Sequence, residues 1–160
     1  MKCPQCGNDN PENAQFCGGC GTNLIPGEAS VGTRLPMVGF GEAISRGFSN
    51  YFRFNGRSTR AEYWWWALFG AISSSALGIV ETIVGIPGIL RICFFLATII
   101  PSLAVSARRL HDINRTGLWL FLWLVPVVGW IVLIVWAIDR GDEGQNQHGP
   151  DPRQPTSQQP

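Results

Sequence analysis

The sequence predicts a membrane all-α protein: three transmembrane helices and an interfacial amphipathic helix, preceded by a minimal zinc ribbon with four cysteine ligands. Two observations lead to this fold class. Hydrophobic residues make up 46% of the 160 residues and charged residues 14%, but the apolar residues are concentrated between positions 63 and 138 in runs long enough to cross a bilayer. Four of the five cysteines form two C-x2-C pairs near the N-terminus, a spacing typical of a structural zinc site.

These changes in composition divide the chain into four parts. We expect a zinc ribbon at residues 1–24, a flexible linker at 25–39, a membrane domain at 40–140 and a polar tail at 141–160. The linker contains prolines and glycines and shows no helical period. The tail has too few apolar residues to build a core, so we expect it to be mostly disordered. The formal net charge of +1 gives no indication of a nucleic-acid-binding surface.

The N-terminal segment CPQCGNDNPENAQFCGGCG places Cys3, Cys6, Cys17 and Cys20 in the spacing C-x2-C-x10-C-x2-C. Four thiolates complete a closed tetrahedral shell around one Zn²⁺ ion, which leaves no open position for a substrate. So short a domain cannot build a core without a metal. Disulfides or redox-active thiols are the alternatives to a zinc site. The segment resembles the short zinc ribbons at the ends of many bacterial proteins, and this resemblance implies a structural ribbon that mediates contacts.

Residues 40–54 are predicted to form an amphipathic helix. The apolar residues fall at helical offsets 0, 4, 8, 11 and 12, on one face, and they are Phe40, Ile44, Phe48, Tyr51 and Phe52. The segment is too polar to span a bilayer but suits the membrane interface, with its aromatic rings in the lipid and its arginines near anionic head groups. The alternative is a soluble helix that packs on the membrane domain.

Three apolar runs follow, and we expect them to span the membrane at about 63–85, 89–107 and 117–138. At a rise of about 1.5 Å per residue, each run can cross a hydrocarbon core of about 30 Å. Thr59 and Glu62 form a capping-box pattern before the first run, and Pro101 predicts a kink in the second.

The arginines predict how these spans are oriented. They precede the first span and fill the loop between the second and third, whereas the turn after the first span offers only Arg91. The positive-inside rule then places the zinc ribbon and the loop at 108–117 in the cytoplasm, where thiols stay reduced. Three crossings place the tail on the opposite side. A break at 126–129 leaves open that the last segment re-enters the membrane instead of crossing it.

Glu81 lies inside the first apolar run, where a charge costs several kcal/mol unless it is paired. Arg91 follows the next turn and is its natural partner. We interpret the two residues as an intramembrane pair that braces the first hairpin, with a role in an ion pathway as the alternative.

A polar cluster is predicted at the cytoplasmic boundary. If the second span continues as a helix beyond residue 107, Arg108 and Asp112 lie on one face and can pair, while Arg109 points elsewhere. The full set is Arg57, Arg60, Glu62, Arg108, Arg109, His111, Asp112 and Arg115. These residues could form a structural network, or they could bind an anion or a lipid head group. Hydrolysis would need further metal ligands or a nucleophile, which the set does not offer.

Three parts of the sequence resemble one bacterial family. The segments YFRFNGRSTRAEYWW at 51–65, PSLAVSARRLHDINRTGLW at 101–119, and PVVG with GQNQHGPDP at 126–129 and 144–152 are similar to the YhaH-like inner-membrane family, domain of unknown function 805. The resemblance implies a small multi-spanning protein of the bacterial inner, or plasma, membrane and supplies no activity or catalytic residues. It includes part of the tail, which leaves open that the tail folds back near the arginine-rich loop.

We therefore expect an integral inner-membrane protein without enzymatic activity: a membrane-anchored adaptor whose cytoplasmic, Zn²⁺-binding ribbon recruits a protein partner. The first alternative is a module that senses a lipid head group or another anion through the arginine and histidine cluster. The second is an oligomeric small transporter or pore, because three spans in one copy are too few to enclose a pathway. The expected partners are membrane lipids and a protein bound by the ribbon, and self-association into a homo-oligomer is left open.

Overall fold

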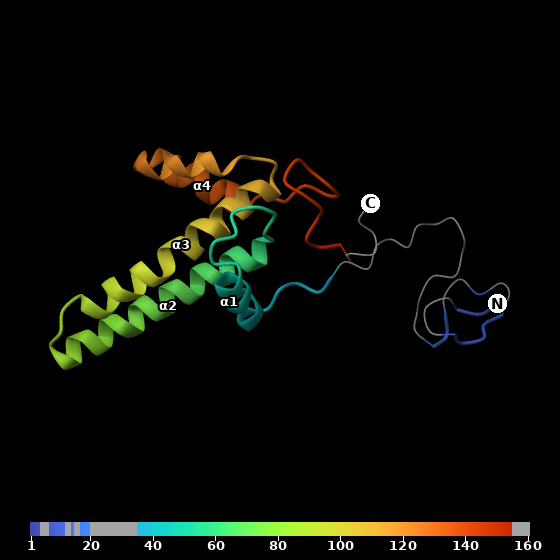
Figure 1. Ribbon diagram of the computed structural model, residues 1–160, viewed down its shortest axis with the longest axis horizontal. Helices are drawn as coiled ribbons and strands as arrows, with labels where there is room; N and C mark the ends of the chain where they lie inside the picture. The colour runs from blue at the N-terminus through green and yellow to red at the C-terminus, as the bar shows by residue number, and fades with distance from the viewer. Residues whose placement is uncertain (4–6, 12–13, 15–16, 20–34, 155–160) are drawn as a thin grey trace.

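The structure, a computed structural model, describes residues 1–3, 7–11, 14, 17–19 and 35–154 (Figure 1). Within these residues the helices are α1 (Phe40–Ser49), α2 (Arg60–Val84), α3 (Ile89–Asp112), the 3-10 helix η1 (Gly117–Leu124) and α4 (Val128–Ile138). The described part contains no β-strand, and its β-type pairings are two isolated bridges. The all-helical fold class predicted from the sequence is confirmed.

Helices α2 and α3 form a long antiparallel hairpin (Figure 1). The turn between them uses Gly85 and Gly88, whose φ angles of 76° and 81° lie in the left-handed region that glycine adopts without strain. With 25 and 24 residues, both helices are long and apolar enough to cross a membrane. Only 6% of the most apolar stretch of α2 and 22% of that of α3 is buried. Apolar surface that is exposed on this scale favours lipid over water as the surrounding medium.

The two candidate spans are longer than the predicted runs. Helix α2 begins at Arg60 rather than at residue 63, because the Thr59 Oγ1 accepts a hydrogen bond from the Glu62 amide at 3.2 Å and caps the helix. Helix α3 continues to Asp112 rather than ending at residue 107, so the arginine-rich RRLHD segment is helical.

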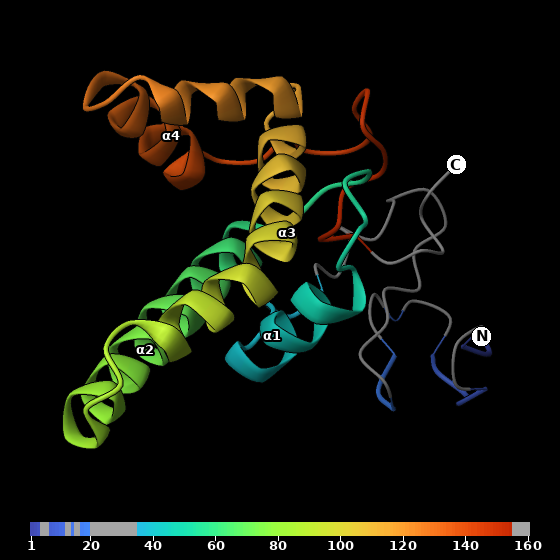
Figure 2. The same ribbon diagram turned by 60° about the vertical axis from the view of Figure 1, so that its left-hand side comes forward.

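Helix α3 contains Pro101 and changes direction between the half that lies along α2 and its C-terminal half (Figure 2). Proline has no amide hydrogen, so the carbonyl four residues earlier loses its helical partner. That carbonyl belongs to Ala97, and the Tyr51 hydroxyl donates a hydrogen bond to it at 2.8 Å. The segment that follows α1 therefore supplies the donor that the kinked helix lacks.

The predicted third span is wrong as a single transmembrane helix. Residues 117–138 form η1 and α4, separated by a turn, and together they make a helical hairpin that returns to the C-terminal end of α3 (Figure 2). At about 2.0 and 1.5 Å per residue, the two pieces reach about 16 Å each, roughly half of a hydrocarbon core of about 30 Å. Helices α2 and α3 are thus the two candidate membrane spans of the described chain.

The turn of this hairpin depends on Pro126 and Gly129. Pro126 has no amide hydrogen with which to continue a helix. A Cβ atom on Gly129 would lie 1.9 Å from the Leu122 carbonyl oxygen, so the close approach of the two pieces leaves no room for a side chain. The Trp130 indole N–H donates a hydrogen bond to the Trp123 carbonyl at 3.0 Å and joins the pieces.

Helix α1 is shorter than the predicted helix at 40–54. Asn50 ends it, because the Asn50 side chain donates a hydrogen bond to the Arg46 carbonyl at 2.9 Å. The helix packs against α2, where the Phe48 and Trp66 rings meet edge to face with centroids 5.2 Å apart. Beyond α1, the Phe52 side chain is 74% exposed. Helix α1 therefore packs on the helical body, and its position at the membrane interface stays a prediction.

The described part of the tail, residues 141–154, is folded, so the predicted disorder is wrong there. The Asp142 amide donates to the Asp112 carbonyl at 2.8 Å, and the Leu35 amide donates to the Arg153 carbonyl at 2.9 Å. The tail thus lies at the same end of the body as the α3 C-terminus (Figure 1), and its predicted position on the opposite side is also wrong. Linker residues 25–34 and tail residues 155–160 lie outside the described residues.

Candidate functional site

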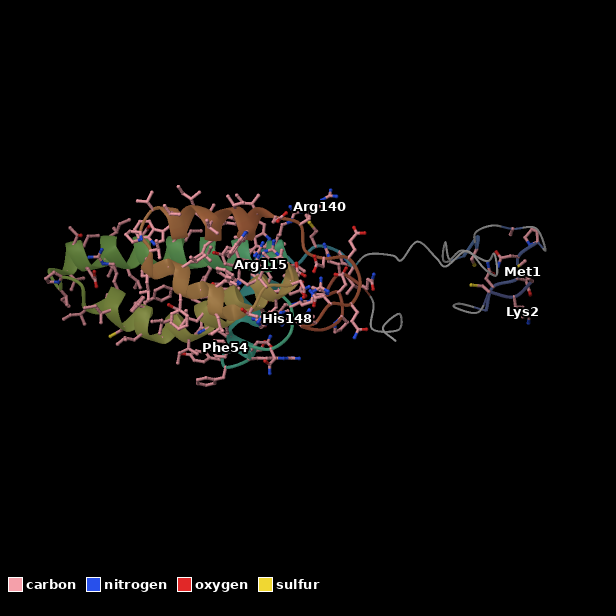
Figure 3. All side chains as sticks on the ribbon, turned by 90° about the horizontal axis from the view of Figure 1, so that it is seen from above. Met1, Lys2, Phe54, Arg115, Arg140 and His148 are labelled. Atoms are coloured by element: carbon pink, nitrogen blue, oxygen red, sulfur yellow. The ribbon has the colours of Figure 1, made fainter. Side chains whose placement is uncertain are left out.

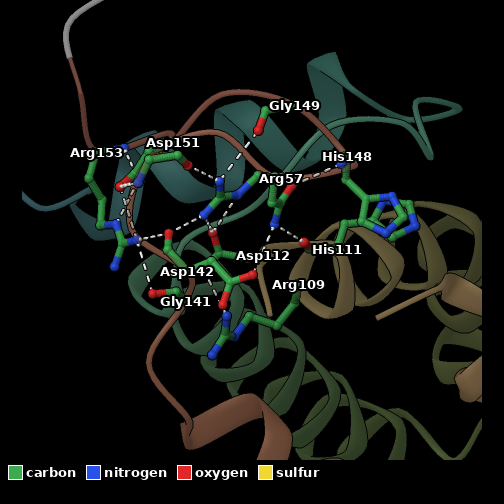
Figure 4. Close-up of polar contacts among 12 residues, drawn as sticks. Arg57, Arg109, His111, Asp112, Gly141, Asp142, His148, Gly149, Asp151 and Arg153 are labelled. Atoms are coloured by element: carbon green, nitrogen blue, oxygen red, sulfur yellow. Dashed lines mark hydrogen bonds and ion pairs between the residues drawn. The ribbon is translucent and has the colours of Figure 1, made fainter. Parts of the chain in front are cut away.

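Most of the predicted polar residues meet at one end of the helical body, which we call the polar end. Four parts of the chain come together there: the loop before α2, the C-terminus of α3, the C-terminus of α4 and the tail (Figure 4). Figure 3 shows Arg115, Arg140 and His148 at this same end.

Asp112 is the centre of the polar end and is 1% exposed. Its carboxylate accepts hydrogen bonds from the Arg57 Nε at 3.0 Å and from the Arg109 Nη1 at 2.9 Å. We call Arg57, Arg109 and Asp112 the Asp112 cluster. The predicted pairing of Arg108 with Asp112 is wrong, because Arg108 faces α2 while Asp112 and Arg109 face the loop before α2 and the end of α4.

Arg109 caps the C-terminus of α4. The last carbonyls of a helix have no partner within the helix, and positive charge is favourable near them. The Arg109 Nε donates to the Ala137 carbonyl and the Arg109 Nη2 to the Trp136 carbonyl, both at 3.2 Å. Arg60 adds a hydrogen bond from its Nη1 to the Ile138 carbonyl at 3.1 Å. The second arginine of the RRLHD segment therefore fixes where the hairpin of η1 and α4 ends, which we call the η1–α4 hairpin.

Arg57 binds the tail. Its Nη1 donates to the Gly144 carbonyl at 2.5 Å and its Nη2 donates to the Asp142 carbonyl. The Asn146 side chain donates to the His111 carbonyl at 2.9 Å. A Cβ atom on Gly141 would lie 1.8 Å from the Asp112 Oδ2, so the tail backbone lies directly against the cluster. These tail residues were not predicted individually. Gly144 and Asn146 lie in the family-like segment GQNQHGPDP, which was the available signal, whereas Gly141 and Asp142 precede it.

Asp151 and Arg153 hold the tail in its own turn. The Arg153 Nε donates to the Asp151 Oδ1 at 2.7 Å, and its Nη2 donates to the Gly141 carbonyl at 3.1 Å. Burial raises the pKa of Asp151, but the hydrogen bonds and charge of Arg153 outweigh it and hold that pKa below the ordinary value of 3.8. The hydrogen bond to Asp151 raises the pKa of Arg153 above its ordinary value. Both side chains are therefore charged at neutral pH.

Arg108 and Glu62 form a separate buried pair between α3 and α2. The Arg108 Nη1 lies 3.1 Å from the Glu62 Oε1, and both side chains are nearly inaccessible. A capping box has a second hydrogen bond, here from the Thr59 backbone N–H to the Glu62 carboxylate. This bond is absent among the described contacts, because the Glu62 side chain pairs with Arg108 instead. Arg46 of α1 lies 3.8 Å from the same carboxylate. This pair fastens α1, α2 and α3 to one another.

The two histidines of the chain stack on each other. The rings of His111 and His148 are parallel, with centroids 3.9 Å apart (Figure 4), and the His111 Nδ1 lies 3.1 Å from the Gly56 carbonyl. His148 was missed at the sequence level because it stands in the polar tail. Arg115 lies outside these contacts, with its guanidinium 4.1 Å above the Trp136 ring.

Glu81 and Arg91 lie at the opposite end of the α2–α3 hairpin and are paired. The Arg91 Nε donates to the Glu81 Oε2 at 2.7 Å, and the Arg91 backbone amide donates to the Glu81 Oε1 at 2.9 Å. The carboxylate thus also satisfies an amide in the first turn of α3. The pair therefore joins the end of α2 to the start of α3 across the hairpin turn.

The described part of the N-terminal segment brings one cysteine of each C-x2-C pair together. Cys3 and Cys17 are both buried and form one cluster. The Gly19 amide and the Asn10 side chain donate to the Cys17 Sγ at 3.4 and 3.5 Å, as suits a thiolate ligand. Cys6 and Cys20 lie outside the described residues, so no group of three metal ligands is seen within the described part. The two cysteines that are described fit a zinc ribbon.

Two family descriptions match the chain in separate regions. Residues 2–24 match the zinc-ribbon domain. Residues 51–150 match the family described as "Protein of unknown function (DUF805)", a region that contains both candidate spans, the η1–α4 hairpin and the Asp112 cluster. No solved structure matches the chain.

Similar proteins occur in Escherichia coli. The chain is 41% identical to inner membrane protein YhaI over 105 residues, which cover 65% of this chain and 89% of YhaI. It is 38% identical to inner membrane protein YhaH over 109 residues, 65% of this chain and 90% of YhaH. A match at 27% identity over 135 residues covers 62% of this chain and 86% of the uncharacterized protein YiiR. The chain therefore belongs to the DUF805 family of membrane proteins, and it carries a zinc-ribbon domain at its N-terminus.

Proposed function

We propose that this protein is a membrane-anchored adaptor of the bacterial inner membrane, in which the zinc ribbon recruits a protein partner and the helical body anchors it. One observation carries the proposal: a zinc-ribbon domain and a DUF805 membrane domain occupy separate regions of one chain. The end of the linker is tied to the polar end through Leu35 and Arg153, so the ribbon-bearing segment approaches the body where the arginines gather.

The distribution of arginines supports a cytoplasmic position for the polar end. Of the described arginines, only Arg91 lies at the far end of the α2–α3 hairpin, and the others gather at or near the polar end. The positive-inside rule places such an end in the cytoplasm. Two crossings then bring the ribbon and the tail to the same side, in the compartment where thiols stay reduced. The relatives YhaI and YhaH are named inner membrane proteins, which fits this location.

Zinc would be held by Cys3, Cys6, Cys17 and Cys20 in this proposal. Four thiolates form a closed shell, so the ion would supply folding free energy to the ribbon rather than chemistry. The N–H groups that point at the Cys17 sulfur would stabilise the thiolate form.

The Asp112 cluster has a structural role in this proposal, and we propose no enzymatic activity for it. Its arginines donate to Asp112, to carbonyls of α4 and to carbonyls of the tail. Donors that are engaged in this way are not available to polarise a substrate. The cluster holds the hairpin and the tail in place, which a membrane anchor requires.

The experiment is quantitative mass spectrometry of proteins that co-purify from native membranes. Four forms are compared: the wild type, a deletion of residues 1–24, Cys3→Ser with Cys17→Ser, and the control Cys93→Ser, which makes the same change outside the ribbon. We expect a specific protein to be lost with the deletion and with the double substitution, but not with the control. Zinc content should fall in parallel from one ion per chain. A protein that stays bound to the deletion would refute the adaptor role of the ribbon.

A further inference from the structure

A pocket of about 220 Å³ lies at the polar end, between the start of α2, the residues that follow α4, the tail and the docked end of the linker. Its charged lining consists of Arg46, Arg60, Arg140, Arg153, Asp112 and Glu143. Four arginines against two carboxylates leave an excess of positive charge. The linker end at residues 35–38 forms an apolar wall.

Two of these arginines retain unused hydrogen-bond donors. Arg60 uses its Nη1 on the Ile138 carbonyl, which leaves its Nε and Nη2 without a partner among the described residues. The Arg140 guanidinium forms no hydrogen bond or ion pair within the described chain, where only its backbone amide is engaged, by Asp139. Arg153, in contrast, is bound to Asp151 and to tail carbonyls. Arg46 is paired as well, because its Nη2 donates to Glu42 at 2.6 Å and its Nη1 lies 3.8 Å from Glu62. The pocket arginines without an ion pair among the described residues are therefore Arg60 and Arg140.

The pocket also lies where phosphate groups of a bilayer are expected. Arg60 is the first residue of α2 and precedes the exposed aromatic residues Trp64 and Trp65. Arg140 follows the last apolar residue of α4, Ile138. Aromatic residues of this kind mark the membrane interface, and basic residues beside it attract anionic lipids. The volume is below the roughly 300–1,000 Å³ of pockets for drug-sized ligands, which suits a compact anion.

We propose that this pocket binds a phosphate-bearing anion through the guanidinium groups of Arg60 and Arg140. A guanidinium presents a planar fork of N–H donors that matches two phosphate oxygens. The ligand is a phosphate monoester or diester, supplied either by an anionic phospholipid such as phosphatidylglycerol or by a soluble phosphate. The site adjoins the Asp112 cluster and shares Asp112 with it, but Arg57 and Arg109 of that cluster do not line the pocket and are engaged by the protein itself. The site does not depend on the zinc ribbon.

Binding is tested with the full chain in nanodiscs. In neutral phosphatidylcholine discs, calorimetric titration with inorganic phosphate measures binding of a soluble anion. In discs of phosphatidylcholine and phosphatidylglycerol, native mass spectrometry measures how strongly the protein retains the anionic lipid over the neutral one. The variants are Arg140→Gln and Arg60→Gln with Arg140→Gln. The control is Arg53→Gln with Arg115→Gln, which removes the same two charges from residues that do not line the pocket.

We expect each glutamine in the pocket to weaken anion binding about tenfold or more, as the loss of a charged hydrogen bond predicts, and the control to change it less than twofold. Arg60 also caps α4, so the single Arg140→Gln variant tests the site if the double variant fails to fold. Phosphate binding in neutral discs identifies a soluble ligand, whereas phosphatidylglycerol enrichment without phosphate binding identifies the lipid. The proposal is overturned if the wild type binds neither, or if the control loses as much binding as the pocket variants.

Discussion

Replacing Asp112 with asparagine removes the only carboxylate that Arg57 and Arg109 share within the described contacts. All three side chains are about 2% exposed or less. Asparagine keeps the size of the side chain but loses the charge, so two buried guanidinium groups lose their counterion. Removal of one partner from a buried ion pair costs about 3–5 kcal/mol. We therefore expect Asp112→Asn to lower the free energy of unfolding by that amount, a large share of the stability of a typical domain.

The measurement is equilibrium unfolding in mixed detergent and dodecyl sulfate micelles, followed by tryptophan fluorescence. Trypsin cleavage after Arg140 and Arg153 reports in parallel whether the tail is released. The control is Glu42→Gln, because Glu42 pairs with Arg46 on the surface, with side chains 52% and 40% exposed, and such pairs contribute about 0–1 kcal/mol. If Asp112→Asn unfolds within 1 kcal/mol of the control and its tail resists trypsin as the wild type does, the cluster does not hold the tail.

Three further changes test other parts of the structure. Gly129→Ala places a Cβ atom 1.9 Å from the Leu122 carbonyl oxygen, so it should lower the free energy of unfolding by about 1–3 kcal/mol or more in the same assay. The control is Gly41→Ala, which should not destabilise the protein because nothing lies within 4 Å of the added Cβ atom. Tyr51→Phe removes the donor to the Ala97 carbonyl, which Pro101 leaves without a helical partner, and should lower the free energy of unfolding by about 1 kcal/mol. The control Tyr63→Phe should lower it less. Equal losses of stability in the two variants would contradict the role of Tyr51. The pKa of Asp151 is lowered in the folded tail, so its contribution should be complete above the ordinary pKa of 3.8 and disappear as the pH falls through the lower folded value. Amide hydrogen exchange in residues 141–153, corrected for intrinsic rates, should therefore accelerate under acid in the wild type, and an Asp151→Asn variant with the same acid response would disprove the linkage.

The two candidate spans could be predicted from the sequence because their signals are local. An apolar run of the right length and a Thr59 cap each follow from a few neighbouring residues. The Glu81–Arg91 pairing could also be predicted from the sequence, since the two residues flank one short turn and a charge at that depth requires a partner.

The η1–α4 hairpin could not be predicted from hydropathy alone. The run at 117–138 is apolar throughout, and a run of that length looks the same whether it crosses once or folds in half. The difference lies in Pro126 and in the contact of Gly129 with the Leu122 carbonyl, and the second of these is visible only when both pieces are in place.

The folded tail escaped prediction for a different reason. Its composition indicates disorder, because composition measures how much apolar surface a segment can bury. The tail is held instead by backbone carbonyls that accept from Arg57 and Arg153. Every residue carries such a carbonyl, so the residue types of the tail do not show which of its carbonyls Arg57 binds. Of the two arginines, Arg57 lies far away in the sequence.

The Asp112 cluster and the η1–α4 hairpin depend on each other electrostatically. Two buried arginines face one buried carboxylate, so the cluster carries an excess positive charge that is costly to bury. The C-terminus of a helix carries a partial negative charge and unpaired carbonyls, and α4 brings its C-terminus to Arg109 at 3.2 Å. The α4 carbonyls thus stabilise the buried positive charge of the cluster, and Arg109 in turn satisfies carbonyls at the end of α4. A third span that crossed the membrane would carry that helix end to the far side and leave the Nε and Nη2 of Arg109 without the α4 carbonyls that they bind. The position of Arg109 and the turn at Pro126 therefore depend on each other.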